Sequence, residues 1–175
     1  TLVFAAPLQD YSIAYTVKKP DGIVTDLIKY YLRDGNKFRV DYLHPDGVTY
    51  AIEILRKDKG LVWSLDPSFK IYFEVPLRQD AWERAVRGIS GTEPPKLGKT
   101  GTAKFLNYTC DIYEVEAEGW TSIFYLEPSM NLILRSETKH KGETFQIREA
   151  TEFSPAKPAA ALFEVPDGYQ KQQNQ

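Results

Sequence analysis

Residues 37–42 read Lys-Phe-Arg-Val-Asp-Tyr, and this stretch decides the fold class. Phe38, Val40 and Tyr42 share one side of an extended chain, and the polar residues between them share the other. Side chains alternate between the two faces of a β-strand, so this pattern is typical of a strand with one face on a core and one in water. Parallel sheets rarely show it, because both of their faces are buried. The stretch therefore predicts an antiparallel sheet.

The same alternation recurs along most of the chain. Further runs lie at Tyr11–Val17, Val24–Leu32, Thr49–Ile54, Leu61–Leu65, Lys70–Val75, Ala103–Val115, Thr121–Leu126, Leu132–Ser136 and Phe145–Ala150. Clusters typical of hairpin turns separate many of these runs. They are Pro20-Asp21-Gly22, Asp34-Gly35-Asn36, Pro45-Asp46-Gly47, Asp66-Pro67-Ser68 and Lys141-Gly142. Strands joined by tight turns form a meander, and a sheet this long tends to curl.

One segment has helical rather than strand periodicity. Within Asp80–Ile89, the apolar residues Trp82, Ala85, Val86 and Ile89 recur at i, i+3, i+4 and i+7. This spacing places them on one side of an α-helix. The segment is therefore predicted to be a short amphipathic helix that lays its apolar face on the concave side of the sheet.

Length and composition indicate one folded domain. A chain of 175 residues matches a single domain, here with an ordered core at 7–169 and a flexible, glutamine-rich tail at 170–175. The hydrophobic share of 42% and the aromatic share of 13% exclude intrinsic disorder. The net charge of -2, with both signs interleaved, argues against nucleic-acid binding. No apolar run is long enough to span a bilayer, so the protein is predicted not to be transmembrane.

The first residues bear on cellular location. Residues 1–7, Thr-Leu-Val-Phe-Ala-Ala-Pro, resemble the end of a secretory signal, in which an apolar stretch precedes small residues. An artificial chain end and an ordinary first strand are the alternative interpretations. Cys110 is the only cysteine, which excludes an internal disulfide and leaves the compartment undecided.

Signatures of catalysis and of metal binding are missing from the sequence. His44, His140 and Cys110 do not have the spacing of a zinc site. Gly98-Lys99-Thr100 resembles the end of a phosphate-binding loop, but Glu93 stands where that loop needs its first glycine. The chain is therefore predicted to be no enzyme and to carry no cofactor or metal.

Aromatic residues are more abundant than a small core requires. The prominent ones are Trp63, Phe69, Tyr72, Phe73, Trp82, Trp120, Phe124 and Tyr125. Either they fill the core, or a curved sheet and a helical lid enclose an apolar cavity. Ligand pockets are mostly apolar with a few fixed polar groups, and burial of an acyl chain is worth about 0.8 kcal/mol per CH₂.

Several stretches resemble known exported proteins. Residues 30–40, His44-Pro45-Asp46-Gly47 and residues 60–67 are similar to the periplasmic lipoprotein carriers of the LolA/LolB type, which have an arginine before a Phe-containing strand, a Pro-Asp turn and a Trp-x-x-Asp-Pro unit. Residues 101–113 and 162–169 resemble the DUF4412 family of exported bacterial proteins. Together the matches touch much of Tyr30 to Tyr169.

The resemblance implies a mainly β (α+β) fold: a half-open antiparallel barrel with a helical lid, exported to the bacterial periplasm or cell envelope. It also implies a hydrophobic cavity for acyl chains and assigns to Arg33 the role of holding the lid closed. This chain has Asp34-Gly35 where the carriers have proline, and its lid is a single short helix. The residues expected to line the cavity are Trp63, Phe73, Trp82, Val86, Phe124 and Leu134.

Two functions follow from these patterns. The first is a non-enzymatic exported protein that binds a lipid or a lipoprotein acyl chain in the cavity. The alternative is a structural or sensory domain of the envelope that has a filled core and binds a protein partner.

Overall fold

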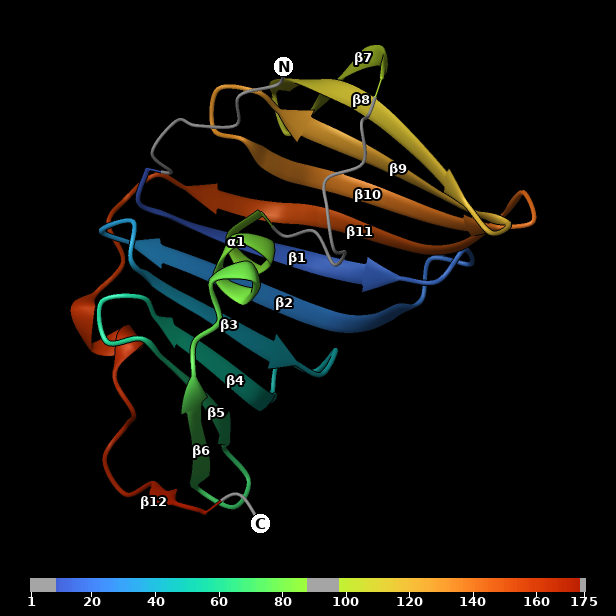
Figure 1. Cartoon of the computed structure of the whole chain (residues 1–175). Helices are drawn as coiled ribbons and strands as arrows, with labels where there is room; N and C mark the ends of the chain where they lie inside the picture. Colours follow the sequence, from blue (N-terminus) through green and yellow to red (C-terminus); the bar gives the residue numbers. More distant parts are fainter. Residues whose placement is uncertain (1–8, 88–97, 174–175) are drawn as a thin grey trace.

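The computed structural model describes residues 9–87 and 98–173, which contain twelve strands in one sheet (Figure 1). The strands are β1 (Tyr11–Lys18), β2 (Val24–Arg33), β3 (Lys37–Leu43), β4 (Thr49–Arg56), β5 (Leu61–Asp66), β6 (Ile71–Pro76), β7 (Lys99–Phe105), β8 (Tyr108–Ala117), β9 (Trp120–Glu127), β10 (Leu132–His140), β11 (Glu143–Ser154) and β12 (Gln170–Lys171). The helical elements in this part of the chain are α1 (Gln79–Arg87) and the short 3-10 helix η1 (Ala160–Phe163).

The sheet consists of two antiparallel meanders joined at its centre. Its strand order is β12-β6-β5-β4-β3-β2-β1-β11-β10-β9-β8-β7. Strands β1 to β6 form one meander and β7 to β11 the other, and antiparallel pairing of β1 with β11 unites them. The sheet is curved and does not close on itself. The predicted fold class, a mainly β half-open antiparallel barrel, is thereby confirmed.

The hairpin turns lie where their residues predict them, with one addition. Residues 103–115 read as a single strand, but the structure divides this region into β7 and β8 at Leu106 and Asn107. These two residues have φ values of 48° and 64°, as the centre of a type I′ hairpin turn requires. The sequence signal is weak because the turn has an asparagine without the glycine that usually follows it.

The end of the chain differs from the predicted flexible tail. Gln170 and Lys171 form β12, the one strand in the described part that pairs in parallel, along β6. The ammonium group of Lys171 lies 2.8 Å from a carboxylate oxygen of Glu74. Backbone pairing and this ion pair together hold a polar, low-propensity segment against the sheet edge.

Helix α1 lies on the concave side of the sheet (Figure 1). Its bounds agree with the predicted start near Asp80, whereas Ile89 lies outside the described residues. The proposed signal remnant at residues 1–7 also lies outside them.

Each face of the sheet carries a hydrophobic core. The concave core joins α1 to both meanders, and its buried members are Tyr11, Ile13, Tyr15, Leu32, Phe38, Val40, Leu55, Trp82, Val86, Cys110, Leu132, Leu134 and Ala150. The convex core lies under η1 and consists of Ile52, Ile54, Trp63, Leu65 and Phe163.

Candidate functional site

Strand alternation explains how one sheet supports two cores. On β4, Leu55 belongs to the concave core and its neighbour Ile54 to the convex core. Leu55 is the cross-strand partner of Phe38, and Ile54 is the partner of Arg39. Cross-strand partners share a face, so β3 and β4 present apolar side chains to α1 and a mixture of apolar and arginine side chains to the opposite side.

The convex core is covered by residues 155–169, which we call the strap. Three arginines of the sheet donate hydrogen bonds to strap carbonyls: Arg33 to Pro158 at 2.6 Å, Arg39 to Leu162 at 2.8 Å, and Arg56 to Phe163 at 2.9 Å. The Phe163 side chain is completely buried beneath them.

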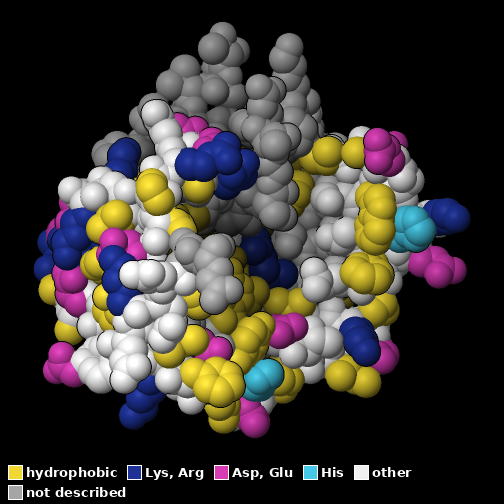
Figure 2. Space-filling view, turned by 60° about the horizontal axis from the view of Figure 1, so that its bottom comes forward, with side chains coloured by type: hydrophobic (Ala, Val, Ile, Leu, Met, Phe, Trp, Pro, Cys, Tyr) yellow, Lys and Arg dark blue, Asp and Glu magenta, His cyan; other side chains and the backbone are white. Residues whose placement is uncertain are grey.

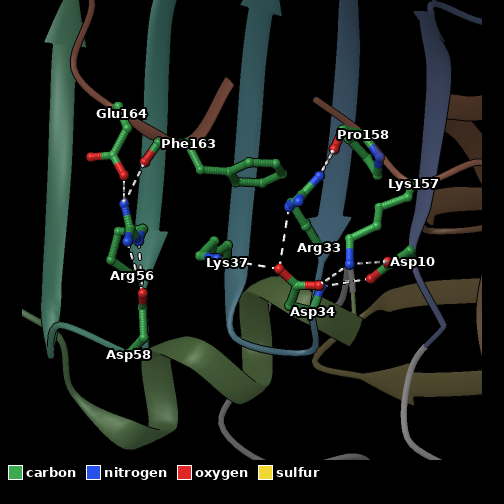
Figure 3. Close-up of polar contacts among 10 residues, drawn as sticks. All are labelled: Asp10, Arg33, Asp34, Lys37, Arg56, Asp58, Lys157, Pro158, Phe163 and Glu164. Atoms are coloured by element: carbon green, nitrogen blue, oxygen red, sulfur yellow. Dashed lines mark hydrogen bonds and ion pairs between the residues drawn. The ribbon is translucent and has the colours of Figure 1, made fainter. Parts of the chain in front are cut away.

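Ion pairs add to this attachment (Figure 3). Arg56 binds the carboxylates of Asp58, at 2.7 Å, and of Glu164. Lys157 of the strap pairs with Asp34 in the turn between β2 and β3. The strap is therefore fixed by charge-assisted hydrogen bonds along its length, which are stronger than neutral ones.

The concave core is covered in a different way. Trp82 and Val86 of α1 are 7% and 3% exposed, and both pack in the concave core. The ammonium group of Lys57 lies 5.6 Å from the centre of the Trp82 ring. Within residues 79–86, the side-chain ion pairs join Asp80 to Arg78 and Arg84, and no described side chain of the helix forms a hydrogen bond or ion pair with the sheet. Among the described side chains of α1, apolar packing and the cation–π contact with Lys57 join the helix to the sheet.

The concave face also carries fixed polar groups. The Tyr15 hydroxyl donates a 2.7 Å hydrogen bond to the Ile133 carbonyl, and burial raises the pKa of Tyr15. The Arg148 guanidinium lies 4.9 Å from the centre of the Tyr15 ring and donates to the Tyr30 hydroxyl at 3.3 Å. Glu53 is the cross-strand partner of Val40, and burial raises the pKa of its carboxyl group.

The residues predicted to line a cavity are only partly brought together. Trp82, Val86 and Leu134 all belong to the concave core. Trp63 lies in the convex core, where its indole N–H donates to Glu74 at 2.8 Å. Phe73 is 36% exposed on β6.

Two further predicted positions lie away from this group. Phe124 is partly buried on β9, outside the buried members of either core. Arg33, expected to hold the lid, instead makes its hydrogen bonds with Asp34 and with the strap. Its described contacts therefore lie on the face opposite α1.

Sequence reasoning missed the strap and the Arg148 group. The first nine residues of the strap, Pro-Ala-Lys-Pro-Ala-Ala-Ala-Leu-Phe, have neither strand nor helix periodicity, and the resemblance noted for residues 162–169 does not place the segment on the sheet. Arg148 lies within an alternating run on β11, and only the pairing of β1 with β11 brings it to Tyr15.

The described residues contain no cluster of three or more metal-ligating side chains. No helix within them is long and apolar enough to cross a membrane.

Comparison with known proteins gives structural likeness alone. No family model matches the sequence, and no curated protein matches it. An uncharacterized conserved protein from Thermus thermophilus is similar with a TM-score of 0.68 and 15% identity, over 95% of this chain and 91% of that one.

MucB is similar in two solved complexes. In the Pseudomonas aeruginosa MucA/MucB complex the TM-score is 0.61 at 15% identity, over 91% of this chain and 56% of that chain. In MucB bound to MucA(peri) the TM-score is 0.60 at 12% identity, over 96% of this chain and 58% of that one. The present chain thus spans just over half of the MucB chain, and these likenesses establish the fold.

Proposed function

We propose that this domain is an exported, non-enzymatic binding protein of the bacterial periplasm or cell envelope. It holds a lipid or a lipoprotein acyl chain against the concave core, with α1 as a displaceable lid. The observation that carries the proposal is the contrast between the two covers of the sheet. The strap is attached by arginines and ion pairs, whereas α1 is held by the side chains of Trp82 and Val86 and by the contact with Lys57.

The free energies of burial favour replacement of α1 by an acyl chain on the concave core. Lifting α1 exposes Trp82 and Val86, which costs about 1.5–3 kcal/mol for each side chain. An acyl chain with about fourteen CH₂ groups gains on the order of 10 kcal/mol when it is buried, at about 0.8 kcal/mol per CH₂. The binding site on this account consists of Trp82, Val86 and Leu134. Phe73 and Phe124 are proposed to extend it along the flanking strands.

The fold supports this proposal. The half-open sheet with a helix in its concavity is the architecture that the resemblance to the LolA/LolB carriers implies, and we propose a distant relationship to them. Besides the departures seen in the sequence, Arg33 binds the strap in this protein and not the helix.

A titration with a fluorescent fatty acid tests the proposal. We expect a dansyl-labelled undecanoic acid to bind the wild-type protein with increased emission, and Trp82→Glu to abolish binding while the far-ultraviolet β spectrum is unchanged. Glu83→Lys is the matched control, because Glu83 lies on the exposed side of the same helix and its substitution should leave the affinity unchanged. Equal affinity of wild type and a folded Trp82→Glu variant would contradict the proposal.

One observation favours a second candidate function. Trp82 and Val86 already fill the concave core, so the same surface is suited to an amphipathic helix of a protein partner in the envelope. Solved complexes of the structurally similar MucB contain MucA. If the wild-type protein does not bind the fatty-acid probe, this second function becomes the better account.

A further inference from the structure

A row of exposed apolar side chains lies at one end of the sheet. In an antiparallel meander alternate hairpins meet at the same end, and register places the turns β1–β2, β3–β4, β5–β6, β8–β9 and β10–β11 together. Each of these turns presents a large apolar residue at or near it. These residues, which we call the tip rim, are Ile23 (58% exposed), Val48 (59%), Phe69 (76%), Trp120 (39%) and Phe145 (59%).

The opposite end of the sheet is different. Among the described residues, the turns β2–β3, β4–β5, β7–β8 and β9–β10 present one exposed large hydrophobic residue, Leu106 at 37%. The exposed apolar residues of the turns are therefore concentrated at one end of the sheet. Single exposed hydrophobic residues scattered over a surface are ordinary, but such a concentration is not.

In three of the turns an aspartate carboxylate accepts a hydrogen bond from the backbone of the apolar tip residue. The backbone N–H of Ile23 donates to the Asp21 carboxylate at 3.0 Å, and that of Val48 donates to Asp46 at 3.0 Å. In the turn before β6, Asp66 accepts from the backbone N–H of Ser68 at 2.8 Å and also from that of Phe69 at 3.2 Å. In each turn the aspartate is bonded back to its own backbone, as in an Asx turn, and the apolar side chain is left in solvent.

The other two tips form an aromatic cluster across neighbouring hairpins. The Trp120 and His140 rings are 4.5 Å apart between centroids, and Phe145 meets Trp120 edge-on at 5.4 Å. Tryptophan and phenylalanine are typical of proteins that enter the interface of a lipid bilayer.

Cationic and ionisable groups surround the apolar tips. Lys19, Lys70 and Lys141 are exposed in three of the five turns, and the acidic residues exposed at the same end are Asp21, Asp46, Glu118 and Glu143. Both histidines of the chain lie at this end, His44 against Tyr50 at 4.6 Å and His140 against Trp120. Figure 2 shows two histidine patches, each bordered by hydrophobic side chains. Charged side chains of both signs thus lie between the apolar tips. Separate apolar tips that include tryptophan and phenylalanine match the interface of a lipid bilayer, so burial of the tips, and not net charge, is the basis of the proposed binding.

We propose that the tip rim docks on the surface of a lipid bilayer, with its apolar side chains in the headgroup region. The proposal does not depend on ligand binding at the concave core. Docking at this end leaves the concave face and α1 accessible from the side.

Sedimentation with vesicles tests this proposal. The probe is a vesicle of phosphatidylethanolamine and phosphatidylglycerol in a ratio of about three to one. We expect the wild-type protein to sediment with the vesicles. The double variant Trp120→Ser/Phe145→Ser should bind at least about tenfold more weakly, because each apolar tip contributes to burial. Leu106→Ser, at the opposite end, is the matched control and should bind like the wild type.

Tryptophan emission gives a second readout. Trp63 and Trp82 are buried, so a blue shift on vesicle addition would come from Trp120. Trp120→Phe should still bind vesicles but lose the shift. Trp82→Glu should retain vesicle binding, which separates this proposal from the concave site.

Two outcomes would overturn the proposal. One is a wild-type protein that neither sediments with the vesicles nor changes its emission. The other is a wild-type protein that self-associates without binding vesicles, while the double variant is monomeric. That second result would assign the tip rim to contact between copies of this chain.

Discussion

At the scale of single residues, the arginines of the convex face have the clearest role. The strap has no ladder of its own, so its carbonyls need donors from elsewhere. Arg33, Arg39 and Arg56 supply them from the three neighbouring strands β2, β3 and β4. A guanidinium has five N–H donors, which allows Arg56 to bind Asp58 and the Phe163 carbonyl together.

Arg56→Met should therefore destabilise the domain. The Arg56 side chain is 5% exposed, and its loss leaves the Phe163 carbonyl without its donor. Because Asp58 and Glu164 are partly exposed, we expect a loss of about 2–3 kcal/mol in the free energy of unfolding, measured by urea denaturation. Lys59→Ala removes a more exposed partner of Glu164 and should change stability by less than about 0.5 kcal/mol. An equal effect of both substitutions would contradict the assigned role of Arg56.

Asp34 should make the free energy of unfolding depend on pH under acidic conditions. The hydrogen bond from Lys157 lowers the pKa of the Asp34 carboxyl from 3.8 to about 2, and Lys37 adds to this effect. A carboxyl group whose pKa is depressed by folding stabilises the native state above pH 3.8, and the stabilisation is lost as the pH falls toward 2.

Asp34→Asn tests this dependence, because asparagine tolerates the positive φ of 55° at this position. Urea unfolding at a series of pH values should show the variant less stable at pH 6, with the difference shrinking below about pH 4. A difference that is constant across the series would show that the ion pair does not titrate as described.

The two tryptophans show what a sequence can predict about a site. Trp63 and Trp82 are equally suited to an apolar cavity by composition. Helical spacing placed Trp82 on the face of α1 that packs on the sheet, and the structure has it there. Strand alternation shows that Trp63 faces away from Val62 but does not show which face is concave, since that depends on the curl of the whole sheet.

At the scale of elements, α1 and η1 cover opposite faces with unequal attachment. Regions with few buried contacts open locally at lower free energy than the rest of a domain. We expect amide hydrogen exchange, followed by mass spectrometry, to be faster in peptides covering residues 79–87 than in peptides covering β3. Equal protection of α1 and β3 would contradict the description of α1 as a lid.

The sequence predicts elements best where a local pattern is complete. The hairpins with Asp-Gly or Lys-Gly turns lie as expected, whereas the turn at Leu106 and Asn107 was missed because it lacks the glycine. The strap was missed for a different reason: its position depends on arginines that lie more than a hundred residues earlier in the chain.

At the scale of the whole molecule, the pairing of β1 with β11 determines the shape. It joins two meanders into one curved sheet, so that Tyr15 and Arg148 come together on the concave face. The strap covers the convex core through arginines and ion pairs, and a short helix packs on the concave core. This difference between the faces is the basis of the proposed binding function.

The most direct test of that function is native mass spectrometry of the protein produced with export, followed by organic extraction of any bound molecule. The account predicts an added mass of a lipid or an acylated species that organic solvent releases and that Trp82→Glu abolishes. A mass equal to the polypeptide alone, in a folded protein that takes up no fatty-acid probe, would contradict acyl-chain binding and favour recognition of a protein partner.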